Sequence, residues 1–123
     1  PDMKYELNTY KYPKAGDPNA LVSIGLIDLS TKKTVWADLG SDANIYVPRI
    51  LWTRNPNQLA IQRLNQLQNK LDILLTDAST GKTQVLLTDS SSTWLNIHDN
   101  LYFMTDGKSF LWSSDTDGFN HLY

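Results

Sequence analysis

The sequence predicts an all-β chain built from antiparallel four-stranded meanders. Apolar and polar residues alternate in several short segments, and clusters of Gly, Pro, Asn, Asp and Ser separate these segments. In addition, one turn motif recurs after about 50 residues, a period in the range of roughly 40 to 50 residues that is typical of propeller blades. We therefore predict a partial β-propeller of about two and a quarter blades, each blade having four strands.

The composition fits one globular domain and excludes several other classes. The chain has 123 residues, of which 41% are hydrophobic and 20% charged, so it is neither disordered nor fibrous. Its net charge of -2, without a basic run, argues against a nucleic-acid partner. No apolar run reaches the ~18 residues that a membrane span needs. The absence of Cys rules out a disulfide framework and leaves the compartment undecided.

The first part, residues 1–44, is expected to hold a lead-in loop and the last two strands of one blade. Pro13, Gly16 and Pro18 predict a loop or an edge segment over residues 1–18. The two strands are expected at residues 20–29 and 34–39, joined by a polar turn.

The central part, residues 45–90, is predicted to be one complete blade. Leu71, Ile73 and Leu75 share one face of a predicted strand, and no helical spacing persists through this part. One sheet cannot bury both of its faces alone, so we expect a neighbouring sheet on each side. Its strands are expected at residues 47–53, 58–64, 70–77 and 82–87.

The last part, residues 91–123, is predicted to be most of a third blade. A Ser-rich connection is expected at residues 89–93, followed by three strands. Asp106-Gly107 and Asp117-Gly118 are hairpin turn signals between these strands. The strands are expected at residues 101–105, 109–113 and 120–123.

An internal repeat favours the propeller over a plain β-sandwich, which stays open as an alternative. Residues 28–34 (DLSTKKT) match residues 77–83 (DASTGKT) at five of seven positions. The hairpin around residues 50–61 is echoed by the hairpin around residues 101–112. Repeated units at this spacing are expected of blades that each bury their faces against neighbours.

Two motifs resemble ligand sites but are better explained as turns. Residues 79–83 (STGKT) end like a phosphate-binding loop, yet Thr76 stands where that loop needs Gly, and the segment joins two predicted strands. Asp115, Asp117 and Gly118 resemble part of a calcium loop whose first ligand position would be Ser113 and whose bidentate Glu would fall beyond residue 123. We predict a hairpin turn at both places.

No catalytic constellation is visible in the sequence. His98 and His121 are the only histidines and there is no Cys, so a zinc site is not expected. No G-x-S-x-G elbow is present to activate a Ser. We expect no cofactor and no activity of the chain by itself. Two alternatives stay open: a free-standing β-sheet module that binds peptide or carbohydrate, and a small self-sufficient hydrolase.

Several motifs, taken in order, resemble the dipeptidyl peptidase IV family of serine peptidases. They span nearly the whole chain, and in that family they lie within an N-terminal eight-bladed propeller that precedes an α/β-hydrolase domain. The motifs are YPKAG at 12–16, YVPR at 46–49, LNQLQN at 64–69, Trp94 and DGFNHLY at 117–123.

The resemblance implies a parent enzyme that removes N-terminal dipeptides with Pro or Ala at the second position. Its catalytic Ser, Asp and His would lie downstream, and this segment would form the wall and rim of the substrate-access chamber. The family places substrate-facing residues after Trp94, where Asn96 and His98 are the candidates here. The implied partners are the other blades, the hydrolase domain and a peptide substrate. We expect a periplasmic or other extracytoplasmic bacterial parent, and a fragment that self-associates through exposed strand edges.

Overall fold

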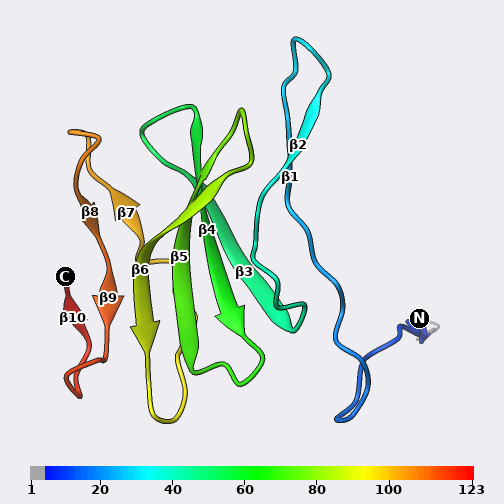
Figure 1. The fold of residues 1–123 in the computed structure, drawn as a ribbon. Coiled ribbons are helices and arrows are strands. Elements are labelled where there is room, and N and C mark those ends of the chain that lie inside the picture. The colour runs from blue at the N-terminus through cyan, green and yellow to red at the C-terminus, as the bar shows by residue number, and fades with distance from the viewer. Residues whose placement is uncertain (1–4) are drawn as a thin grey trace, which may run out of the picture.

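The computed structural model describes residues 5–123 and shows ten β-strands and no helix among them. All strand pairs are antiparallel. As Figure 1 shows, a four-stranded sheet stands in the middle, with a two-stranded hairpin on one side and two short hairpins on the other. The predicted all-β class is confirmed, and the arrangement is that of a partial β-propeller.

The central sheet is the predicted four-strand meander, with its strands in the order β3-β4-β5-β6. Its last strand runs on to Ser90, whereas the sequence predicted a Ser-rich connection from residue 89. The longer strand forms because Asp89 and Ser90 still pair with Leu71 and Lys70 of the neighbouring strand. The strands are β3 (Ile45–Trp52), β4 (Gln58–Asn65), β5 (Lys70–Asp77) and β6 (Thr83–Ser90).

The two copies of the repeated turn share the backbone hydrogen bonds to their Asp side chain. Asp28 Oδ1 accepts from the backbone N–H of Ser30 at 2.8 Å and of Thr31 at 3.0 Å. Asp77 Oδ1 accepts in the same way from Ser79 at 3.0 Å and Thr80 at 2.8 Å. The repeat in the sequence is therefore a repeat of one turn geometry.

The fifth residue of each turn takes a left-handed conformation, with φ of 58° at Lys32 and 74° at Gly81. Only the second turn requires glycine for space. A Cβ atom at Gly81 would lie 2.1 Å from the backbone oxygen of Trp36, in the preceding hairpin. The turn thus brings two sheets into backbone contact.

The first hairpin is shorter than the sequence predicted. Its strands are β1 (Gly25–Ile27) and β2 (Thr34–Trp36), whereas strands were expected over residues 20–29 and 34–39. The pairing ends because the chain changes partner: Ala37 N–H still donates to Ile24, but Asp38 N–H donates to the carbonyl of Gly81. In the described part of the chain, residues 5–123, no strand pairs with residues 20–23.

The last part contains β7 (Tyr102–Phe103), β8 (Phe110–Leu111), β9 (Ser113–Ser114) and β10 (His121–Leu122). β7 pairs with β8, and β9 pairs with β10. Between β8 and β9, Trp112 exchanges two backbone hydrogen bonds with Tyr123. The segment predicted as one strand at 109–113 is therefore one extended run that pairs with β7 through its first half and with β10 through its second.

The two inner strands of the central sheet, β4 and β5, are buried on both faces, and the sequence predicted a neighbour on each side. One apolar cluster lies between this sheet and the first hairpin, and it includes Leu59 and Ile61 of β4. A second cluster lies between the sheet and β7–β9, and it includes Ala60 and Leu64 of the same strand together with Trp112. Alternate residues of one strand thus enter two different cores.

Candidate functional site

Arg63 on β4 makes polar contacts across the first interface, which we define as the contact between the central sheet and the hairpin β1–β2 with the segment that follows it. Its Nη1 donates to the carbonyl of Leu39 at 2.7 Å, and its Nη2 donates to Asp72 Oδ2 at 2.7 Å. Thr88 Oγ1 donates to the other oxygen of Asp72 at 2.6 Å. Burial alone would raise the pKa of Asp72, but the hydrogen bonds from Arg63 and Thr88 outweigh it, and the pKa falls below its ordinary value. The hydrogen bonds of Arg63 thus join the central sheet to the segment after β2, and both carboxylate oxygens of Asp72 are engaged.

Asp89 on β6 makes the polar contacts of the second interface, which lies between the central sheet and the strands β7–β9. Its side chain is 7% exposed and accepts from Trp112 Nε1 and from Ser114 Oγ, each at 2.9 Å. Sequence reasoning missed this residue, because its Thr-Asp-Ser-Ser context is typical of a solvated connection. Both carboxylate oxygens have donors, so Asp89 anchors the last part of the chain to β6.

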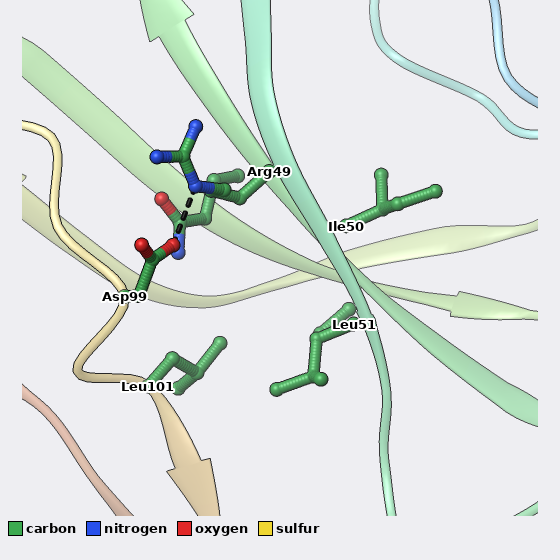
Figure 2. A pocket seen from close by; sticks show the side chains of 7 residues that line it. Arg49, Ile50, Leu51, Asp99 and Leu101 are labelled. Atoms are coloured by element: carbon green, nitrogen blue, oxygen red, sulfur yellow. Dashed lines mark hydrogen bonds and ion pairs between the residues drawn. The ribbon is translucent and has the colours of Figure 1, made fainter.

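A pocket of about 140 Å³ opens at the same interface, between β3 and the segment that leads into β7. Figure 2 shows Arg49 and Asp99 facing each other across it, with Leu51 and Leu101 beside them. Arg49 Nε donates to Asp99 Oδ1, and Arg49 Nη1 donates to the carbonyl of Pro48 at 2.8 Å. The hydrogen bond from Arg49 lowers the pKa of Asp99, so at pH 7 the two side chains form an ion pair whose charges cancel.

Gln62 lines this pocket from β4, directly opposite Arg49 in the strand register. The residue is 4% exposed. Among residues 5–123, its Oε1 is a buried side-chain acceptor without a hydrogen-bond partner. Buried polar atoms are nearly always bonded, so this oxygen is an acceptor beside the pocket that residues 5–123 leave unused.

The predicted site residues Asn96 and His98 lie near each other in sequence but in different environments. Asn96 is exposed, and its Oδ1 accepts from Trp94 Nε1 at 3.2 Å. His98 is half-buried, and its ring packs against Trp112 with the ring centroids 4.2 Å apart. Neither residue lines the pocket beside Arg49.

His98 also contacts Ser113, but the geometry does not activate this Ser. The two side chains are 3.4 Å apart, from Nε2 to Oγ. His98 Nδ1 accepts from the backbone N–H of Asn100, so in a neutral ring Nε2 carries the proton and cannot accept one from Ser113. Ser113 is buried, with 1% of its surface exposed, and its Oγ also accepts from Asn100 Nδ2 at 2.8 Å. The contact is a structural hydrogen bond.

The motifs that resemble ligand loops are turns between strands, as predicted. Residues 79–81 lie in the β5–β6 turn, and Gly118 N–H donates to Asp115 in the β9–β10 turn. Across residues 5–123 no group of three or more His, Cys, Asp or Glu side chains is placed to hold a metal ion. The same residues include no helix with the length and hydropathy of a membrane span.

The chain matches a known family and known structures over nearly its whole length. The profile of the dipeptidyl peptidase IV (DPP IV) N-terminal region matches residues 2–123. The structure of Porphyromonas gingivalis dipeptidyl peptidase 4 superposes with a TM-score of 0.86 and 35% identity, covering 94% of this chain and 17% of that one.

Curated relatives give the same family at lower identity. Venom dipeptidyl peptidase 4 of Apis mellifera is 29% identical over 96 residues, which are 75% of this chain and 12% of that protein. Inactive dipeptidyl peptidase 10 of Mus musculus is 27% identical over 106 residues, or 82% of this chain and 13% of that one. The chain spans a small part of the length of these relatives. It belongs to the dipeptidyl peptidase IV N-terminal region family.

Proposed function

We propose that this chain is the non-catalytic propeller segment of a serine exopeptidase that removes N-terminal X-Pro or X-Ala dipeptides. In this role it contributes wall and rim to a chamber through which peptides reach the catalytic domain. The observation that carries the proposal is that the central sheet contributes side chains to a separate apolar core on each of its two faces. Such a sheet needs neighbours on both sides, as a blade within a closed propeller has.

The family match supports the peptidase but does not by itself supply the activity. One relative is a venom dipeptidyl peptidase, while another bears the name inactive dipeptidyl peptidase. The same N-terminal architecture therefore accompanies both kinds of parent. We place the reacting Ser, Asp and His in a C-terminal α/β-hydrolase domain, outside these residues, in a bacterial and extracytoplasmic parent.

Asn96 and His98 are proposed as rim residues of the chamber. The exposed amide of Asn96 can meet a peptide directly. His98 is held against Trp112 and acts by fixing the course of residues 95–100.

The proposal is tested on the full-length protein. We expect a downstream G-x-S-x-G elbow in its reading frame, and release of p-nitroaniline from Gly-Pro-p-nitroanilide by the purified protein. A frame without a hydrolase domain would overturn the proposal and favour the free-standing module that binds peptide or carbohydrate. Fluorophosphonate labelling of the isolated 123-residue chain would instead establish a self-sufficient hydrolase.

The isolated chain should also self-associate. Ile50 and Trp52 are each 54% exposed, although they pair with Ile61 and Leu59, whose side chains belong to the first core. This uncovered apolar strip lies beside the unpaired edge of β3, and such edges favour association. Sedimentation velocity should show dimers or larger species, and a stable monomer at high concentration would contradict the expectation.

A further inference from the structure

The pocket beside Arg49 has both of its walls within the described chain. One wall is β3 and β4 of the central sheet, and the other is the segment at Asp99 and Leu101. The Arg49–Asp99 pair closes one side of it, as Figure 2 shows. The pocket's shape is therefore set by residues 49–101 and by the packing of two neighbouring blades.

The polar groups of the pocket offer both hydrogen-bond donors and acceptors. Gln62 Oε1 is a buried acceptor without a donor among residues 5–123. Within residues 5–123, Arg49 Nε is engaged with Asp99 and Nη1 with the carbonyl of Pro48, so the N–H groups of Nη2 and the second N–H of Nη1 remain as donors. A ligand that satisfies both must carry an N–H or O–H donor close to an acceptor.

The charge of the pocket is balanced, and this discriminates among ligands. Arg49 and Asp99 neutralise each other, and Asp99 has 76% of its side chain exposed. A carboxylate ligand would meet Asp99 and would leave Gln62 Oε1 without a donor. An ammonium ligand would meet Arg49 and would offer it no acceptor. A neutral amide avoids both costs, because its N–H and C=O groups are adjacent.

The rest of the lining is aliphatic. Leu51, Ala60 and Leu101 supply apolar surface next to the polar groups. The volume of about 140 Å³ exceeds the roughly 10–15 Å³ that a cavity needs in order to hold one water molecule. The pocket has room for a small group that is amide at one end and aliphatic at the other.

We propose that this pocket binds a neutral carboxamide with an aliphatic flank. A turn of the Gln62 amide brings its buried Oε1 to the pocket, where the ligand's amide N–H donates to it. The ligand's carbonyl accepts from Arg49, and its aliphatic flank packs on Leu51 and Leu101. A peptide backbone and an Asn or Gln side chain both carry this chemistry. The site is separate from peptide hydrolysis, and it stands whether or not the parent cleaves dipeptides.

Three probes with the same isopropyl group and different charge test the proposal on the full-length protein. They are isobutyramide, isobutyrate and isobutylammonium, with binding followed by ligand-detected NMR titration. We expect isobutyramide to bind at least tenfold more tightly than either charged probe. N-methylisobutyramide distinguishes the two sources: binding as tight as that of isobutyramide indicates a backbone amide, and weaker binding indicates a side-chain carboxamide. Equal affinity for all three probes, or preference for a charged one, would overturn the proposal.

Substitution of Gln62 separates ligand binding from a structural role. Gln62→Met keeps the volume and removes the acceptor, so we expect at least a tenfold loss of isobutyramide affinity while the melting temperature stays equal or rises. Gln84→Met, on the exposed face of β6, is the matched control and should change neither quantity. A lower melting temperature with unchanged isobutyramide affinity would show that Gln62 serves only the fold. Should the Gln62 variant fail to fold, the ranking of the probes on the unaltered protein still decides.

Discussion

The central sheet has two interfaces, and they are built differently. Toward the first hairpin, the turn at Gly81 touches the backbone of Trp36, and Arg63 bridges Leu39 to Asp72. This interface is therefore closed by a backbone contact and by a side-chain bridge. Toward the last part, Trp112 and the buried Asp89 anchor the contact, but the pocket beside Arg49 stays open.

The difference shows that one sheet can have a fully closed interface on one side and an interface with a pocket on the other. Backbone-to-backbone contact leaves no volume for a ligand and tolerates no added atom. Side-chain contact through a large aromatic residue and a buried carboxylate leaves space at its margin, where Gln62 Oε1 has no donor within residues 5–123. We therefore expect substitutions at the first interface to affect folding most, and those at the second interface to affect folding less.

The largest effect is expected from Gly81→Ala. The new Cβ atom would collide with the backbone oxygen of Trp36 at 2.1 Å, and the residue must keep a φ of 74°. Strain and displacement together should lower the free energy of unfolding by about 4 kcal/mol or more. Urea unfolding followed by Trp fluorescence measures this loss.

Gly107→Ala is the control for backbone strain alone. Gly107 has a φ of 66°, but a Cβ atom added there would have no other atom within 4 Å beyond its chain neighbours. The substitution should cost about 1–2 kcal/mol. If the two Gly variants lost the same stability, close backbone contact would not be what closes the first interface.

A smaller loss is expected from Asp89→Ala at the second interface. The change leaves Trp112 Nε1 and Ser114 Oγ without their acceptor. Loss of hydrogen bonds to a buried charge should cost about 2–3 kcal/mol. Asp89→Asn keeps an acceptor for Trp112 and should recover about half of the loss. A cost for Asp89→Ala as large as that of Gly81→Ala would remove the contrast between the interfaces.

The sequence predicted the fold in the places where local chemistry decides it. Alternation located all four central strands, and the Asp-x-Ser-Thr repeat located two turns of identical geometry. It overestimated β1, because the end of that hairpin depends on Asp38 bonding to Gly81 in another sheet. The pocket was missed for the same reason: Arg49, Gln62 and Asp99 carry no local pattern, and only the packing of two blades brings them together.

The smallest effect concerns the repeated turns and their pH dependence. Hydrogen bonds from Ser79 and Thr80 lower the pKa of Asp77 to about 2, from an ordinary value of 3.8, and hydrogen bonds from Ser30 and Thr31 lower the pKa of Asp28. Below pH 3.8 the unfolded chain binds protons more readily than the folded one, so the contribution of these turns is complete above that pH and is lost as the pH falls toward 2.

Asp77→Asn removes the titrating group while its side-chain oxygen can still accept the turn hydrogen bonds. The free energy of unfolding of this variant should therefore fall less steeply between about pH 4 and pH 2 than that of the unaltered protein. Asp77 lies in the turn that touches Trp36, whereas Asp28 lies in a turn at the outer end of the first hairpin. If closure of the first interface depends on the Asp77 turn, Asp28→Asn will reduce the pH dependence of the free energy of unfolding less than Asp77→Asn does. An equal reduction by both variants would mean that each turn acts only on its own hairpin.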